Sequence, residues 1–84
     1  MRKKRAGHDP EIISHNIKKM RLELGYTQEK LNEILSERLD RAKPFRMKSL
    51  SDWDNGKSVP HDETLHAIAD IFHVEYLVFV NTKL

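Results

Sequence analysis

Apolar side chains recur at intervals of three and four residues through most of this 84-residue chain, and this spacing constrains its fold more than any other feature. The first series is spaced by 4, 3 and 4 residues, which places its members on one face of an α-helix: Ile13, Ile17, Met20 and Leu24. Asp9 followed by Pro10 is a typical helix start, and Gly25 is a typical helix end. We therefore predict a first helix over residues 10–24.

Three later segments have the same periodicity. A second helix is expected to begin after Thr27, a residue that favours the cap position, and to run to about Leu39. A third, short helix is expected around residues 46–54. A fourth is expected to start at Asp62, where an acid favours a helix N-terminus, and to continue to Phe72.

The last apolar segment, residues 75–80, is apolar on all sides, so its pattern fits a helical turn and a strand equally well. The predicted fold class is all-α, a compact bundle of four to five helices in one domain. The absence of cysteine excludes disulfides, thiolate metal sites and a cysteine nucleophile. Because the chain has no apolar run of roughly 20 residues and no signal peptide, a cytoplasmic protein is expected.

Basic residues are concentrated in two zones. Residues 1–5 carry four cations, and residues 38–48 carry five cations against one acid, whereas the rest of the chain has six cations and twelve acids. Such zones on an acidic body favour a polyanion, most often nucleic acid, although both zones could simply be solvated. Since residues 1–8 lack periodicity, we predict a flexible basic arm there. Its cations are Arg2, Lys3, Lys4 and Arg5.

A short helix opening on Thr27-Gln28, followed by another that ends on Asn55-Gly56, has the order of a helix-turn-helix. Residues 17–31 and 50–57 resemble the opening and the recognition-helix end of the Xre/Cro-type family of phage and bacterial transcriptional regulators. Residues 60–72 resemble the fourth helix of that family. The resemblance implies a lambda-repressor-like DNA-binding domain over residues 9–80. It also implies a sequence-specific regulator of double-stranded DNA, expected to be a dimeric repressor that reads a pseudo-palindromic operator with its third helix in the major groove.

The resemblance also implies which side chains contact DNA. Base edges would be met by Met47, Lys48, Ser51 and Asp52, and phosphates by Gln28, Arg46, Ser49, Asn55 and Lys57. Lys48 suits guanine or a phosphate, Met47 suits a thymine methyl group or partial burial, and Asp52 suits a cytosine amino group or plain helix surface. Leu50 and Trp53 would point into the core, and Asp54 would be a structural acid that holds a cap or an ion pair.

Two features depart from the family pattern. Asn32 stands where the family prefers a small apolar residue, and a buried Asn needs a hydrogen-bond partner. The spacing from Thr27 to Gly56 is about eight residues longer than is usual, with the extra residues at 36–45. We expect the second helix and then a returning loop to fill this insertion, with Phe45 as its apolar anchor. Its cations are hypothesised either to flank the recognition helix on the DNA backbone or only to solubilise the loop: Arg38, Arg41 and Lys43.

The C-terminal segment, residues 76–84, is unusually apolar. An exposed patch of this kind marks an interface, so a homodimer contact is predicted, although the same residues could complete one core. The predicted contact residues are Tyr76, Leu77, Val78, Phe79 and Val80. The basic arm, residues 1–8, is expected to follow a groove of the DNA beside the domain.

Catalysis, metals and cofactors are not expected. The five histidines include no pair four residues apart, and no nucleophile and base stand in a recognisable order. The rival hypothesis is a protein-interaction module or an antitoxin that holds a protein partner through the apolar tail. Asp52 and Asp54 on the third helix favour this rival, whereas Gln28, Lys48 and the two basic zones favour DNA.

Overall fold

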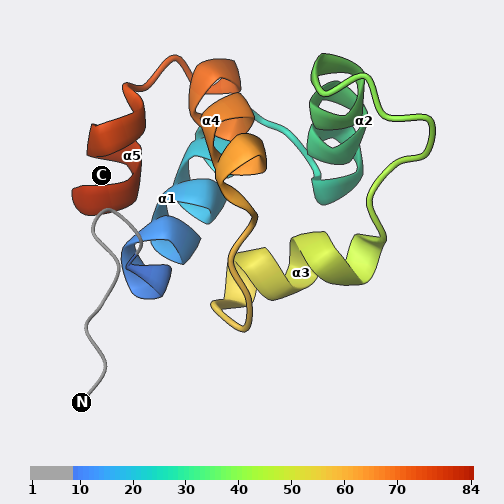
Figure 1. Ribbon diagram of the computed structural model, residues 1–84. Coiled ribbons are helices and arrows are strands. Elements are labelled where there is room, and N and C mark those ends of the chain that lie inside the picture. The colour runs from blue at the N-terminus through green and yellow to red at the C-terminus, as the bar shows by residue number, and fades with distance from the viewer. Residues whose placement is uncertain (1–8) are drawn as a thin grey trace.

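Figure 1 shows the computed structural model of the protein, in which residues 9–84 are described. The described part contains α-helices and no strand, so the all-α prediction is confirmed. The five helices are α1 (Pro10–Glu23), α2 (Gln28–Arg38), α3 (Met47–Asn55), α4 (Asp62–Ile71) and α5 (Tyr76–Asn81). The last segment, for which the sequence left helix and strand open, is therefore a helix. The predicted basic arm, residues 1–8, lies outside the described residues.

The helix ends use the expected local chemistry. The Asp9 carboxylate accepts a hydrogen bond from the Glu11 amide at 3.0 Å, and the Thr27 hydroxyl accepts one from the Lys30 amide at 2.9 Å. Gly56 ends α3 in the left-handed region with φ 76°, which a residue with a Cβ rarely adopts. These contacts explain why the predicted helix boundaries agree with the structure to within one or two residues.

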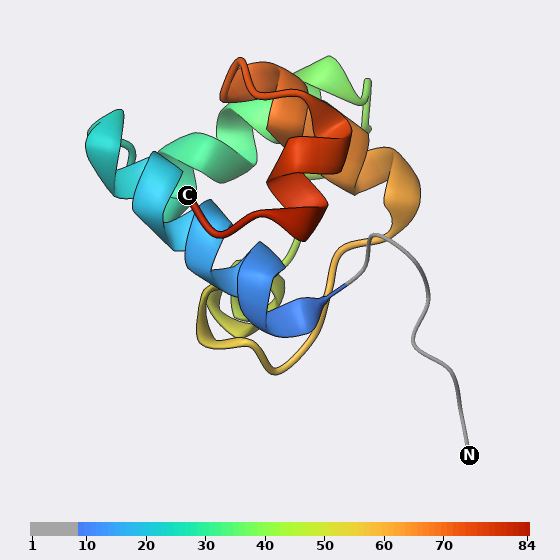
Figure 2. The ribbon, with the colours of Figure 1, turned by 90° about the vertical axis from the view of Figure 1, so that its left-hand side faces the viewer.

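All five helices contribute to one core. Helix α1 packs against α3 and α5, α2 packs against α3 and α4, and α4 packs against α5. Helix α3 lies at the lower edge of the molecule in Figure 1, where no other helix of residues 9–84 lies below it, and Figure 2 shows it low in the view, behind the start of α1. The largest fully buried apolar side chains are Ile13, Ile17, Leu31, Leu35, Leu50, Leu65, Ile68, Phe79 and Val80.

The position of α5 corrects part of the dimer prediction. Phe79 and Val80 are both 0% exposed, so they complete the core of one chain and are not available to contact a second copy. The cause is Asn16 on α1, a buried residue whose side-chain amide donates to the carbonyl oxygens of Phe79 at 2.7 Å and Thr82 at 2.8 Å. The same side chain accepts from the Leu84 amide at 2.8 Å. Asn16 thus fastens α5 and the residues after it to α1, with the apolar face of α5 turned inward.

Candidate nucleic-acid interface

Helix α3 has one buried and one open face. Leu50 and Trp53 are buried, as expected, and Asp54 is buried beside them. The site residues predicted from the sequence lie on the rest of the helix and at its two ends, where they are exposed or half-buried. They are Arg46, Met47, Lys48, Ser49, Ser51, Asp52, Asn55 and Lys57. The structure therefore places these eight candidates on and beside the part of α3 that faces solvent, seven of them polar and one, Met47, apolar.

Two contacts run along the open face of α3. The Lys48 ammonium lies 3.1 Å from Oδ2 of Asp52, and the Asn55 amide donates to the Ser51 hydroxyl at 3.4 Å. Each pair is spaced by four residues, so both pairs lie parallel to the helix axis. Asp52 is accordingly paired with a cation and does not stand as an isolated negative charge. Lys48 remains 81% exposed and reaches solvent together with its partner.

Gln28 is held by α3. Its amide nitrogen donates to Oδ2 of Asp54 at 2.9 Å, and the same oxygen accepts from the Arg21 guanidinium at 2.8 Å. A second guanidinium nitrogen of Arg21 donates to the Tyr26 carbonyl at 2.8 Å. Asp54 therefore is the structural acid that the sequence led us to expect. It joins the end of α1, the start of α2 and the end of α3, and it orients the Gln28 side chain at the first position of α2.

Asn32, which departs from the family pattern, satisfies its side chain with the connection between α2 and α3. Its amide nitrogen donates to the Phe45 carbonyl at 2.7 Å, and its amide oxygen accepts from the Phe45 amide at 3.0 Å and from the Ser36 hydroxyl at 3.1 Å. The Phe45 ring meets Trp53 edge to face, with centroids 5.3 Å apart. Phe45 therefore anchors the returning chain, as predicted.

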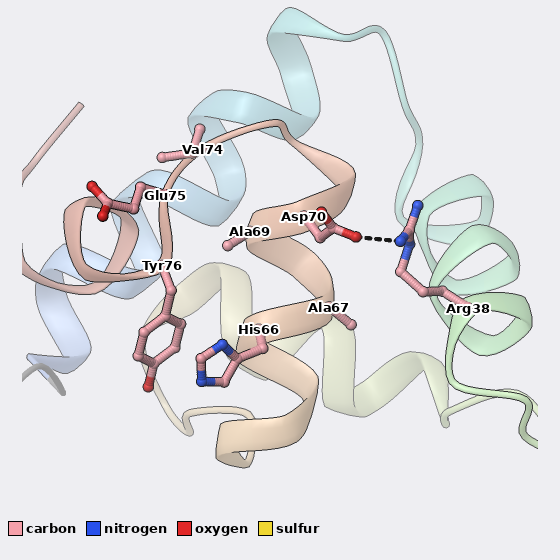
Figure 3. A pocket seen from close by; sticks show the side chains of 8 residues that line it. All are labelled: Arg38, His66, Ala67, Ala69, Asp70, Val74, Glu75 and Tyr76. Carbon is pink, nitrogen blue, oxygen red and sulfur yellow. Dashed lines mark hydrogen bonds and ion pairs between the residues drawn. The ribbon is translucent and has the colours of Figure 1, made fainter.

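The three cations of the insertion have different surroundings. Arg38 forms an ion pair with Asp70 on α4, visible in Figure 3, so it is directed away from α3. This placement differs from our hypothesis that all three cations flank the recognition helix. Arg41 instead lies over the Phe45 ring at 3.9 Å and donates through Nε to the Lys43 carbonyl at 3.1 Å. Lys43 is exposed.

Cations without an acidic partner are concentrated around α3. Among residues 9–84, ion pairs engage five of the eleven Lys and Arg side chains: Lys19, Arg21, Lys30, Arg38 and Lys48. Of the six that make no ion pair in this part of the chain, four lie in the connection before α3 or directly after it. These four are Arg41, Lys43, Arg46 and Lys57.

The segment that contains α4 and α5 has acids but no basic residue other than histidine. Residues 58–82 contain four acids and no Lys or Arg. One of these acids, Asp70, is paired with Arg38. A polyanion is attracted by the cations around α3 and repelled by the other acids among these residues. The four acids are Asp62, Glu63, Asp70 and Glu75.

A surface hollow of about 530 Å³ lies between the end of α2, α4 and the start of α5 (Figure 3). At one end the His66 and Tyr76 rings stack with centroids 3.6 Å apart. The Tyr76 hydroxyl donates to the Asp62 carboxylate at 2.9 Å. Burial, and then the hydrogen bond and the charge of Asp62, raise the pKa of Tyr76 above its ordinary value. The mixed lining and open shape of this hollow point to no particular ligand.

Two further observations concern residues 9–84 alone. No group of three His, Asp or Glu side chains is arranged there as metal ligands would be. None of the helices there is both long and apolar enough to cross a membrane.

Comparisons of the chain with protein-family models, with curated proteins and with solved structures gave no match.

Proposed function

We propose that the protein is a sequence-specific regulator of transcription that binds double-stranded DNA and inserts α3 into the major groove. The observation that carries this proposal is the open polar face of α3, with unpaired cations at both of its ends. A major groove about 12 Å wide admits one α-helix, and a phosphate backbone runs along each edge. Cations at the ends of an inserted helix meet those backbones. The Xre/Cro-type resemblance is consistent with this arrangement.

The α3 side chains divide into two groups in this proposal. Met47, Lys48, Ser51 and Asp52 meet base edges, and Gln28, Arg46, Ser49, Asn55 and Lys57 meet phosphates. The Lys48–Asp52 pair offers a donor for guanine beside an acceptor for a cytosine amino group. Gln28 is already oriented by Asp54, so it loses little side-chain freedom when it donates its second amide hydrogen to a phosphate. The arm cations, Arg2, Lys3, Lys4 and Arg5, add attraction to DNA.

A homodimer remains part of the proposal, but its contact includes fewer residues than the five that the sequence predicts. Since Phe79 and Val80 are buried in one chain, the available apolar surface centres on Leu77, which is 59% exposed, with Tyr76 and Val78 half-buried on either side. Leu77→Asp should convert a dimer into a monomer in sedimentation velocity without unfolding the domain. A wild-type protein that sediments as a monomer at micromolar concentration would remove the dimer from the proposal.

The rival hypothesis, a protein-interaction module, loses one of its arguments. Asp54 is only 8% exposed and is bound by Arg21 and Gln28, while Asp52 is paired with Lys48. Asp54 therefore offers no free carboxylate to a protein partner, and the charge of Asp52 is balanced by Lys48. The exposed Leu77 side chain is the observation that still favours this rival.

Selection from a pool of randomised duplexes tests the proposal directly. The wild-type protein should enrich one sequence motif, and Lys48→Ala should enrich an altered motif because a base contact is lost. Lys83→Ala, which removes an exposed cation outside α3, should enrich the wild-type motif. A wild-type protein that enriches no motif would contradict the proposed function.

A further inference from the structure

We propose that the connection between α2 and α3, residues 39–46, is a preformed clamp for the DNA backbone beside the groove that α3 enters. Arg41 and Lys43 are its phosphate contacts, whereas Arg38 takes no part. This inference rests on the proposed function and adds to it a second contact surface outside the recognition helix. It also explains why the insertion and the unusual Asn32 occur in the same chain.

The clamp is held in place before any DNA arrives. Asn32 binds both peptide groups of Phe45, at 2.7 Å and 3.0 Å, and the Phe45 ring packs on Trp53. The connection is therefore fastened to α2 by hydrogen bonds and to α3 by an aromatic contact. A loop that is ordered in the free protein loses less conformational entropy when it binds, so its contacts contribute more to affinity.

Arg41 is oriented as a phosphate ligand. Its guanidinium lies 3.9 Å from the centre of the Phe45 ring, and its Nε donates to the Lys43 carbonyl at 3.1 Å. These two contacts engage the face and one edge of the guanidinium, and the terminal nitrogens make no hydrogen bond within residues 9–84. Phosphate oxygens are bound in pairs by the edge of an Arg fork. The contact with the Phe45 ring thus leaves the terminal nitrogens of the Arg41 guanidinium available to a phosphate.

The clamp lies beside the start of α3. Phe45 stands two residues before Met47, the first residue of α3, so a guanidinium stacked on its ring is close to the helix that would enter the groove. Lys43 and Arg46 are exposed on the same connection. Together with Arg41 they give the connection three exposed cations within six residues, directly before the helix that would enter the groove.

The nearby acids do not occupy Arg41. Arg41 lines a groove of about 510 Å³ that is also lined by three glutamates of α2: Glu29, Glu33 and Glu37. No carboxylate within residues 9–84 lies at ion-pair distance from the Arg41 guanidinium. Glu33 is itself paired with Lys30 at 3.3 Å. Since the acids reduce the long-range field of the loop, the clamp acts through direct contact with phosphate more than through steering from a distance.

The test is the salt dependence of DNA binding, measured by fluorescence anisotropy on the duplex enriched by the wild-type protein. Each lost phosphate contact should reduce the slope of log K against log salt by about 0.9. Arg41→Ala and Lys43→Ala together should therefore reduce the slope by nearly two such steps. Arg38→Ala is the matched control, because it removes a cation of the same insertion that is bound to Asp70, and it should leave the slope unchanged.

Arg41→Lys adds a second criterion, since it keeps the charge but loses the planar fork. It should retain most of the slope and still lower the affinity severalfold. An unchanged slope in the Arg41→Ala/Lys43→Ala protein, or an equal reduction in Arg38→Ala, would overturn the clamp while leaving the proposed function intact. A wild-type protein that enriches no duplex would instead count against the proposed function itself. All four substitutions are at exposed positions, so the domain should fold in each variant.

Discussion

The side-chain amide of Asn32 pairs with both peptide groups of Phe45, donating to the carbonyl at 2.7 Å and accepting from the amide at 3.0 Å. The Asn32 side-chain amide thus makes the same two hydrogen bonds that a peptide group of a neighbouring backbone segment would make. The pairing closes the connection between α2 and α3 at one point, and it satisfies a polar side chain that is only 5% exposed. Burying an Asn at this position would be unfavourable without partners. Here its hydrogen bonds to Phe45 hold the connection, residues 39–46, in the conformation that lets α3 pack on the core.

Asn32→Ala should destabilise the protein, because it leaves both peptide groups of Phe45 without their partner. The expected loss in the free energy of unfolding is about 1–3 kcal/mol, measured by urea denaturation. Ser36→Ala removes only one hydrogen bond to the same amide oxygen, so it should cost less than about 1.5 kcal/mol. Equal stability of Asn32→Ala and wild type would show that the connection does not depend on this pairing.

The ion pair of Arg21 with Asp54 should behave as a buried pair. Arg21 is buried, with its side chain 11% exposed, and Asp54→Ala leaves it without its carboxylate partner. We expect a loss of about 3–5 kcal/mol in the free energy of unfolding. The double variant Arg21→Leu/Asp54→Leu should recover a large part of this loss, since no buried charge is left unpaired. The measurement is a double-mutant cycle by chemical denaturation.

An exposed pair on the same helix provides the control for that cycle. Lys48 and Asp52 are in contact one helical turn apart on α3, and the Lys48 side chain is 81% exposed. Removing either partner should change the free energy of unfolding by less than about 1 kcal/mol. A cost for Asp52→Ala as large as that for Asp54→Ala would contradict the distinction drawn here between a structural and a surface acid.

Much of the fold could be predicted from the sequence because its local signals agree with one another. Apolar spacing located the buried faces of α1 to α4, and caps such as Asp9 and Thr27 located the ends of helices. The open face of α3 could be predicted from apolar spacing too. If Leu50 and Trp53 point into the core, the helical positions between them face solvent.

The remaining features depend on contacts between distant residues, which periodicity does not describe. Asn16 and Arg21 both lie on the apolar face of α1, three or four residues from Ile13 and Ile17. A polar residue on such a face signals burial with a partner, but the partners of Asn16 lie 63 to 68 residues away along the chain. The sequence left open whether Phe79 faces a second copy or the core, and it did not indicate the ion pair of Arg38 with Asp70, for the same reason.

Tyr76 should show an alkaline titration that depends on Asp62. Burial, the hydrogen bond to Asp62 and the charge of Asp62 raise the pKa of Tyr76 above 10.0. The folded pKa exceeds the unfolded one, so the contribution of the phenol to stability is present below about pH 10 and is lost as pH rises through the raised pKa. Asp62→Asn should lower this pKa, measured by tyrosinate absorbance with Tyr76→Phe identifying the Tyr76 step. An unchanged titration would contradict the role of Asp62.

Lys48 and Lys57 should differ in how they affect DNA binding. Lys48→Ala removes a base contact in our proposal, so it should cost about 1–3 kcal/mol on the preferred duplex and relax the preference at one base pair. Lys57→Ala removes a phosphate contact, so it should weaken binding to all duplexes by a similar factor. Anisotropy titrations against single-base variants of the preferred duplex compare the two. If Lys57→Ala altered the base preference and Lys48→Ala did not, the assignment of the two ends of α3 would be reversed.

The most direct test of the central claim is one anisotropy experiment. The purified protein is titrated against its enriched duplex and against a scrambled duplex of the same composition, at two salt concentrations. We predict a preference of about 10³-fold or more for the enriched duplex, together with an affinity that falls steeply as salt increases. Weak and equal binding to the two duplexes would contradict the claim that α3 reads DNA.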